Sequence, residues 1–115
     1  MNEIEYGHIY WVSFAPSIGH EFQGRRPAVV IQSTDQLRRT NLVTVMPMTS
    51  QISKSHGDDI LVRADKKNRL YGDSLIKVHS IESFDRGRFL KRIGELDREM
   101  MENIRKYLKI HFGIS

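Results

Sequence analysis

The residues best suited to chemistry lie close together in one glycine-bounded segment, residues 19–27. Within it, His20 and Glu21 carry side chains that can transfer protons. Arg25 and Arg26 follow, and their guanidinium groups are planar, permanently charged forks that match phosphate oxygens. The glycines let the backbone approach an anion closely. The segment therefore predicts a phosphate-binding loop, and the alternative is a polar surface loop whose arginines are only solvated.

Two pairs of polar residues near expected strands are further candidates. Thr49 and Ser50 follow an apolar segment, and their hydroxyls can donate hydrogen bonds to a phosphate oxygen. Lys77 and His79 are two residues apart, which on a strand places both side chains on one face, about 7 Å apart at Cα. Imidazole is the usual general acid or base near neutral pH. The alternatives are a strand-ending turn for the first pair and an outward-facing polar stripe for the second.

Basic residues gather in two further runs, residues 63–69 and 86–92, and the second run contains no acidic residue. Tyr71 and two phenylalanines are close to these runs in sequence. Cationic grooves that track the backbone and aromatic rings that stack on bases are the usual means of binding single-stranded nucleic acid. We therefore expect these runs, Arg86 included, to contact a nucleic acid, and the alternative is a solvated face.

The composition suits one small globular domain and excludes several classes of protein. The chain has 115 residues, 39% of them hydrophobic, which fits a single domain over residues 1–115. It has no cysteine, and its five histidines are scattered, so we expect no disulfide, metal site or cofactor. The formal net charge of +4 favours an anionic partner. Without an apolar membrane span or signal segment, the sequence predicts a soluble cytoplasmic protein.

The pattern of apolar residues predicts several short strands followed by one helix. Pro47 is expected to close one strand, and residues 74–81 alternate between apolar and polar side chains, as in a half-buried strand. Near the C-terminus, apolar residues recur every three or four positions, which predicts a helix between Asp97 as N-cap and Gly113 as C-cap. The predicted fold is a curled antiparallel sheet or small barrel with this helix packed on it. The expected strands are residues 9–14, 28–31, 42–46, 60–62, 74–81 and 89–93, with a turn of helix within residues 33–41.

Several segments carry motifs that, in this order along the chain, resemble the MazF/PemK family of toxin ribonucleases. Residues 16–21 and 24–30 resemble the family's P-x-x-G-x-E-x-x-G-x-R-P loop, which is the most specific of the motifs. The ordered matches run through nearly the whole chain. The other matching segments are residues 7–12, 45–50, 73–74, 81–89 and 93–96.

The resemblance implies an SH3-like small antiparallel β-barrel with a C-terminal helix, the α+β fold of CcdB and of MazF/PemK toxins, usually as a homodimer. It implies a metal-independent endoribonuclease that cleaves single-stranded RNA at short sequences. The ribose 2′-OH attacks the adjacent phosphorus and leaves a 2′,3′-cyclic phosphate. The resemblance also implies a cognate antitoxin with an acidic, disordered tail that blocks the RNA groove, and we expect this tail to cover residues 20–26.

The resemblance assigns roles to individual residues. Arg26 matches the family's catalytic arginine and is expected to stabilise charge on the phosphorane. Thr49 matches the phosphate-contacting threonine, and His20 and Glu21 match functional positions of the loop. The general base stays open among Glu21, His20 and His79. The residues expected to contact the RNA are Arg25, Ser50, Lys77, His79 and Arg86.

Two other functions are compatible with the same architecture. A CcdB-like toxin poisons DNA gyrase without cutting RNA, and a non-catalytic SH3-like module binds nucleic acid through its basic face. The arginine–proline pair at residues 26–27 favours the ribonuclease, because the CcdB-like toxins lack it. The sequence leaves open the RNA cleavage sequence, the physiological RNA target and the stoichiometry of an antitoxin complex.

Overall fold

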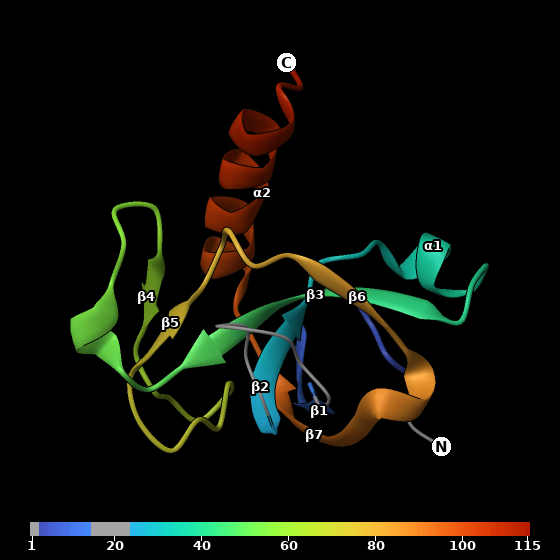
Figure 1. Cartoon of the computed structure of the whole chain (residues 1–115), viewed down its shortest axis with the longest axis horizontal. Helices are drawn as coiled ribbons and strands as arrows, with labels where there is room; N and C mark the ends of the chain where they lie inside the picture. Colours follow the sequence, from blue (N-terminus) through green and yellow to red (C-terminus); the bar gives the residue numbers. More distant parts are fainter. Residues whose placement is uncertain (1–2, 15–23) are drawn as a thin grey trace.

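The computed structural model describes residues 3–14 and 24–115 of the chain (Figure 1). His20 and Glu21 lie outside the described residues. In the described part, one sheet of seven strands is followed by a long C-terminal helix. In chain order the elements are β1 (His8–Ser13), β2 (Arg25–Val30), α1 (Thr34–Leu37), β3 (Leu42–Thr49), the 3-10 helix η1 (Ile52–Lys54), β4 (Ile60–Val62), β5 (Ser74–Ile76), β6 (Glu82–Asp85), the 3-10 helix η2 (Arg86–Arg88), β7 (Phe89–Glu95) and α2 (Arg98–Phe112).

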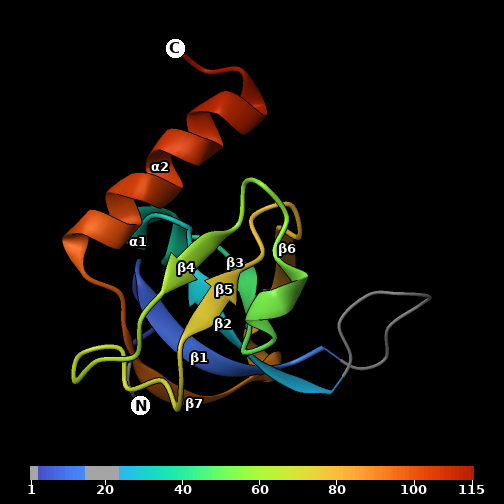
Figure 2. The same ribbon diagram turned by 90° about the vertical axis from the view of Figure 1, so that its left-hand side faces the viewer.

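The sheet is strongly curled, and its paired strands run antiparallel (Figure 1; Figure 2). The strand order is β4-β5-β3-β2-β1-β7, and β6 pairs with the first half of β3. The long strand β3 therefore joins two parts of the sheet, because it pairs with β6 near its start and with β5 near its end. The predicted combination of a curled antiparallel sheet and a C-terminal helix is confirmed.

Alternating side chains bury two apolar clusters, one on each face of the curled sheet. Ile9 of β1 belongs to one cluster, whereas its neighbour Tyr10 belongs to the other. β2 divides Val29 and Val30 between the clusters in the same way. Because successive side chains point to opposite faces, a strand that is covered on both sides needs a continuous apolar run. Each fully buried valine or isoleucine contributes about 1.5–3 kcal/mol to stability.

Helix α2 has the caps that the sequence predicts. The Asp97 carboxylate accepts a hydrogen bond from the Met100 N–H (2.8 Å), and Gly113 is left-handed at the other end (φ 65°). The first half of the helix packs against the sheet through the buried Met101 and Ile104. The caps therefore set the length of α2, and these two side chains set its position.

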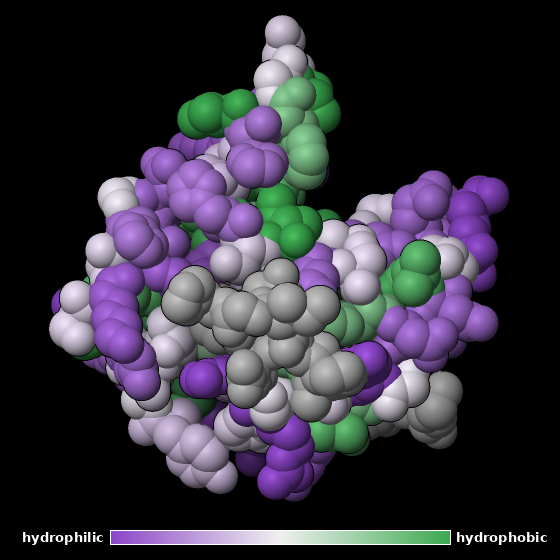
Figure 3. All heavy atoms as spheres, viewed as in Figure 1, coloured by the Kyte–Doolittle hydropathy of each residue, from purple (hydrophilic) through white to green (hydrophobic). Residues whose placement is uncertain are grey.

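The last turns of α2 extend away from the sheet (Figure 2). Large apolar side chains stay exposed there, and Figure 3 shows apolar residues gathered along this part of the surface. They are Ile110, Phe112 and Ile114. Among the described helices, none is both long and apolar enough to cross a membrane.

The expectation that Pro47 closes a strand is wrong. β3 continues through Pro47 to Thr49. Pro47 lies where β3 changes its neighbour from β6 to β5, so its missing N–H falls at an interruption of the ladder. Its carbonyl accepts a hydrogen bond from the Lys77 N–H (2.9 Å) on that side. Proline is therefore tolerated inside this strand.

The strand expected over residues 74–81 is also too long. β5 ends at Ile76, and a turn follows in which the Ser80 N–H donates to the Lys77 carbonyl (3.0 Å). Val78 is fully buried in this turn. The alternating pattern therefore reflects the burial of Val78 and not a continued ladder.

Candidate active site

A pocket with a volume of about 250 Å³ lies where β2 begins and β3 ends. It contains four residues that the sequence singles out, namely Arg25, Arg26, Thr49 and Ser50. We call it the Arg26 pocket. The other lining residues come from β1, β2, β3, β5, β7 and the segment between β4 and β5; they are Trp11, Pro27, Met48, Arg69, Leu70, Tyr71, Gly72, Ser74 and Ile93.

The pairing of β2 with β3 brings the two candidate segments together. The strands run antiparallel with Ala28 opposite Pro47. Continuing this register by two residues places Arg26 opposite Thr49. The arginine and the threonine, well separated in the chain, therefore line the same pocket.

The Arg26 pocket combines positive charge and hydrogen-bond donors that are partly shielded from solvent. Arg26 is half-buried and Thr49 is buried. The Thr49 hydroxyl oxygen accepts a hydrogen bond from the Gln51 N–H (3.1 Å), which leaves the hydroxyl proton available to a ligand. A guanidinium fork beside a hydroxyl donor suits the oxygens of a phosphate group, and partial burial strengthens both interactions. Arg25 and Ser50 are exposed beside them, where a longer ligand would continue.

Trp11, Arg69 and Tyr71 also line the Arg26 pocket, and of the three only Trp11 is without a signal in the sequence. The side chain of Tyr71 is 98% exposed, which is unusual for a large aromatic ring. The signal for Arg69 and Tyr71 in the sequence is the basic run 63–69 followed closely by an aromatic residue. This combination suits the phosphates and bases of a single strand.

The loop that carries Arg69 is held by the buried side chain of Asn68. The Asn68 amide donates to the Arg63 carbonyl (2.8 Å), and its oxygen accepts from the N–H groups of Asp65 (3.0 Å) and Leu70 (3.1 Å). At Arg69 the backbone is left-handed (φ 57°), a conformation uncommon for residues with a Cβ. The hydrogen bonds of Asn68 therefore hold this turn in shape.

Gly94 of β7 lets the same loop pack closely against the sheet. A Cβ at Gly94 would lie 2.4 Å from the Asn68 carbonyl oxygen and 2.6 Å from that of Lys67. The Glu95 N–H donates to the Lys67 carbonyl (3.2 Å). The close approach of the two backbones therefore requires glycine at this position.

Asn68→Ala is expected to lower the free energy of unfolding by about 2–3 kcal/mol, because it leaves buried polar groups unpaired. With RNA, the substrate that the family resemblance implies, the variant should also raise KM more than it lowers kcat, since it releases Arg69 and leaves Arg26 on its strand. Denaturant unfolding and steady-state kinetics measure the two effects. Asn103→Ala on α2 is the matched control. An unchanged KM together with reduced stability would show that the loop does not position substrate contacts.

Lys77 does not line the Arg26 pocket but pairs with a buried carboxylate. Its Nζ lies 2.5 Å from Oδ2 of Asp59, whose side chain is 1% exposed, and it also donates to the Lys54 carbonyl (3.2 Å). Burial raises the pKa of Asp59, but the hydrogen bonds from Lys77 and from the His56 N–H outweigh burial and hold this pKa below its usual value. Lys77 is therefore the counter-charge of a buried carboxylate, and the structure does not place it at the Arg26 pocket.

His79 belongs to a separate cluster between the turn after β5 and helix α2. The Tyr107 hydroxyl lies 3.0 Å from Nδ1 of His79 and 3.0 Å from Nδ1 of His111. Nε2 of His79 lies 3.1 Å from Oδ2 of Asp58. The expectation that Lys77 and His79 share one strand face is wrong, because the strand ends before both residues.

Arg86 lies in a second and larger pocket, away from the lining of the Arg26 pocket. One of its terminal nitrogens donates to the carbonyls of Leu37 and Thr40, so the side chain ties η2 to the end of α1 and to the segment that follows it. The structure therefore brings together Arg25, Arg26, Thr49 and Ser50, and it places Lys77, His79 and Arg86 elsewhere.

The roles expected for His20 and Glu21 fall outside the described residues and stay predictions. Within residues 3–14 and 24–115, no group of three or more His, Cys, Asp or Glu side chains is placed to hold a metal ion.

Comparison with known proteins gives consistent results. The chain is 29% identical over 111 residues to Endoribonuclease EndoA of Bacillus subtilis (strain 168), with 96% of each protein covered. Its fold matches the crystal structure of MazF from Deinococcus radiodurans with a TM-score of 0.81 and 27% identity, covering 96% of both chains. It also matches a mycobacterial endoribonuclease in complex with its cognate antitoxin, with a TM-score of 0.72 and 18% identity over 100% of this chain and 98% of that one.

A family model supports the same conclusion over nearly the whole length of the chain. The model describes a PemK-like, MazF-like toxin of type II toxin–antitoxin systems, and it matches residues 5–112. The matched region includes β2 and β3 and hence the residues of the Arg26 pocket. The chain belongs to the family of PemK-like, MazF-like toxins.

Proposed function

We propose that this chain is an endoribonuclease toxin that cleaves single-stranded RNA in the cytoplasm without a metal ion or cofactor. The observation that carries the proposal is the Arg26 pocket, which a half-buried arginine and a buried threonine line together. Membership of the toxin family and similarity to Endoribonuclease EndoA support the same activity.

In the proposed reaction, the ribose 2′-OH attacks the adjacent phosphorus and the 5′-oxygen leaves, so that one product ends in a 2′,3′-cyclic phosphate. Arg26 donates to the equatorial oxygens of the phosphorane, which carry more charge than those of the bound phosphate. Its interaction therefore strengthens in the transition state and accelerates the reaction. The Thr49 hydroxyl donates to one of the same oxygens.

We assign the proton transfers to His20 and Glu21, which precede Arg26 in the same motif. A base removes the 2′-OH proton, and an acid returns a proton to the leaving 5′-oxygen. His79 is a less suitable base, because its ring contacts Tyr107 and Asp58 and does not line the Arg26 pocket.

The RNA on either side of the scissile bond is proposed to contact the exposed residues around the pocket. Arg25 and Arg69 supply positive charge for flanking phosphates, and the exposed ring of Tyr71 supplies a surface for stacking a base. Ser50 is placed to donate to a phosphate or a base edge.

We further propose that the chain forms a homodimer and that a cognate antitoxin binds the toxin and inhibits it. The exposed apolar end of α2, with Ile110 and Phe112, supports a protein–protein contact there. The formal net charge of +4 complements an acidic antitoxin tail, and the tail is expected to cover residues 20–26. Solved structures with the same fold include an endoribonuclease in complex with its cognate antitoxin.

Incubation with a long single-stranded RNA in excess EDTA tests the proposed activity. Cleavage products with 2′,3′-cyclic phosphate ends are expected, and a fully 2′-O-methylated RNA should resist cleavage because it lacks the nucleophile. Retardation of the RNA in a gel without cleavage would instead identify a binding module. Inhibition of DNA gyrase without RNA cleavage would identify a CcdB-like toxin.

A further inference from the structure

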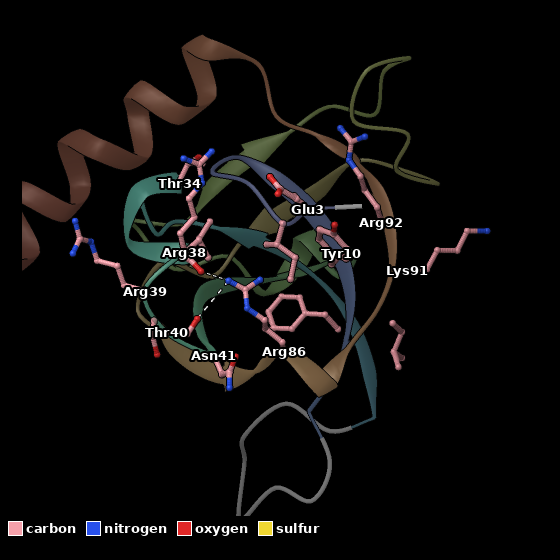
Figure 4. Close-up of a pocket in the computed structure, with 14 residues that line it drawn as sticks. Glu3, Tyr10, Thr34, Arg38, Arg39, Thr40, Asn41, Arg86, Lys91 and Arg92 are labelled. Carbon is pink, nitrogen blue, oxygen red and sulfur yellow. Dashed lines mark hydrogen bonds between the residues drawn. The ribbon is translucent and has the colours of Figure 1, made fainter. Parts of the chain in front are cut away.

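A second pocket, larger than the Arg26 pocket and separate from it, has a volume of about 840 Å³ (Figure 4). We call it the Arg86 pocket. Tyr10 lines it, whereas the next residue along β1, Trp11, lines the Arg26 pocket. Tyr10 and Phe89 pack in one apolar cluster of the sheet, whereas Ile93, which lines the Arg26 pocket, packs against the other cluster. Because neighbouring side chains of a strand point to opposite faces, the two pockets lie on opposite faces of the β1–β7 edge of the sheet.

The Arg86 pocket has a strong excess of positive charge. Figure 4 shows basic side chains around the rim and Arg86 nearer the centre. Arg39 pairs with Asp35 and Arg92 with Glu95, but the other three cations form no ion pair with a carboxylate of the described residues. The basic residues of the lining are Arg38, Arg39, Arg86, Lys91 and Arg92, and its one acidic residue is Glu3.

Arg86 is a half-buried cation without a matching anion among the described residues. Its guanidinium is held by the Leu37 and Thr40 carbonyls, which fix its direction but leave its charge uncompensated. A charge that is partly removed from water is costly unless an opposite charge lies nearby. An anion in the pocket would supply that charge, and four arginines among the five cations favour the planar, multidentate oxygens of phosphate.

Tyr10 provides a second, independent sign of a ligand. Its side chain is 6% exposed and lines the pocket, yet its hydroxyl has no hydrogen-bond partner among the described residues. Burial raises the pKa of Tyr10, so the hydroxyl stays protonated and can donate at ordinary pH. A buried hydroxyl without a partner is uncommon in a folded protein, and a polar ligand atom in the pocket would satisfy it.

The floor of the pocket is apolar. Phe89 packs edge-on against the Tyr10 ring, with ring centroids 5.7 Å apart, and Leu37 is buried beside the α1 end of the pocket. An apolar floor under a cationic rim can hold a flat, apolar-faced group together with a negative one. A volume of about 840 Å³ lies within the range of small-ligand sites.

We propose that the Arg86 pocket binds one nucleotide unit, with its phosphate on the arginines and its base against the apolar floor. The phosphate offsets the charge of Arg86, and a ribose or base atom accepts the hydrogen bond of Tyr10. The nucleotide is either part of an RNA strand that reaches around the β7 edge or a free nucleoside monophosphate. The first source rests on the proposed ribonuclease function, and the second does not.

Two variants test the proposal without touching the Arg26 pocket. Tyr10→Phe keeps the ring and removes only the unpartnered hydroxyl, so the midpoint of thermal unfolding should not fall. Lys91→Gln removes an exposed rim charge. Lys106→Gln, exposed on α2 and outside both pockets, is the matched control for charge. All three proteins should cleave an RNA of about four nucleotides at the wild-type rate.

The binding experiment has one arm for each source of the nucleotide. Adenosine 5′-monophosphate and uridine 5′-monophosphate are titrated while the NMR signals of the protein are followed. Uncleavable 2′-O-methyl strands of about four and about twelve nucleotides are titrated by fluorescence anisotropy. Tyr10→Phe and Lys91→Gln are each expected to lower the affinity of the pocket for its ligand by about fivefold, which is the usual effect of losing one hydrogen bond or charge contact. Weaker binding of the longer strand alone assigns an RNA source, and weaker binding of the monophosphates alone assigns a free nucleotide.

The proposal is overturned if both variants bind every one of these probes as tightly as Lys106→Gln does. It is also overturned if a glutamate-rich peptide binds the wild-type pocket and the nucleotides do not. Cleavage of RNA by the wild-type protein in EDTA separates this proposal from the proposed function. If cleavage fails while the monophosphates still bind, only the ribonuclease function is wrong; if cleavage occurs but the variants behave like the control, only the nucleotide pocket is wrong.

Discussion

Arg26→Ala is expected to lower kcat for RNA cleavage by about 10²–10³-fold while the protein remains folded, since a positioned donor aimed at developing charge is worth about this factor. Arg26 is half-buried at the start of β2 and lines the same pocket as Thr49. Because the charge on the phosphate oxygens grows on the way to the phosphorane, kcat should fall more than KM rises. Single-turnover cleavage of a short RNA measures the loss directly.

Two further variants separate geometry from charge. Arg26→Lys keeps the positive charge but loses the planar fork, so it is expected to recover only a small part of the lost rate. Arg98→Ala removes the same charge from an exposed position in the first turn of α2 and should leave kcat unchanged. Thermal unfolding of each variant confirms that the comparison is between folded proteins. If Arg26→Ala cleaved RNA at the wild-type rate, Arg26 would have no part in the chemical step.

Lys77→Met is expected to lower the free energy of unfolding by about 3–5 kcal/mol at neutral pH, as is typical when one partner of a buried ion pair is removed. The Asp59 side chain is 1% exposed, and Lys77 is its counter-charge at 2.5 Å. The substitution leaves a buried carboxylate with the hydrogen bond from the His56 N–H as its remaining support in the described structure. Denaturant unfolding measures the loss.

The double variant Asp59→Asn/Lys77→Met is the control for this effect. It removes both charges, so most of the lost stability should return even though Lys77 is still absent. If the double variant were as unstable as Lys77→Met, lost packing of the lysine stem would account for the effect and the ion pair would not.

The pH dependence of unfolding provides an independent check. In the wild-type protein the pKa of Asp59 is lowered, so its stabilising contribution is fully present above the ordinary aspartate pKa and is lost as the pH falls below that value. In Lys77→Met, burial without the lysine should raise this pKa, so the penalty is largest at neutral pH and is relieved when Asp59 takes up a proton. The stability difference between the two proteins should therefore narrow on acidification. A difference that stays constant from neutral to acid pH would contradict this account.

Predictions made from neighbouring residues agree with the structure where the local sequence pattern and the burial of side chains favour the same element. The caps of α2 follow from the side chain of Asp97 and the missing Cβ of Gly113, which act within one turn of the helix. The buried strands follow from apolar runs that both faces of the sheet require. The sequence could indicate Arg26 and Thr49 as candidate site residues, because the arginine lies directly before a proline and the threonine directly ends an apolar strand.

Predictions made from neighbouring residues fail where a residue interacts with a segment that is distant in the sequence. Pro47 continues a strand because β3 changes neighbours at that point, which no window around the proline can show. Lys77 was open to several roles until the fold set Asp59 beside it. Arg69 is held in a left-handed turn by Asn68, whose hydrogen bonds form only when the loop closes.

By itself, the sequence determined the kinds of element, the caps of the final helix and the motif that marks the family, because each depends on neighbouring residues. Only the tertiary structure decided which charged side chains meet. It brought Arg26 and Thr49 into one pocket, paired Lys77 with a buried carboxylate, and placed Arg86 in a separate pocket. Electrostatic and hydrogen-bond interactions depend on distance in space, and in a curled sheet that distance is set by strand order and register, which the order of residues along the chain does not reveal.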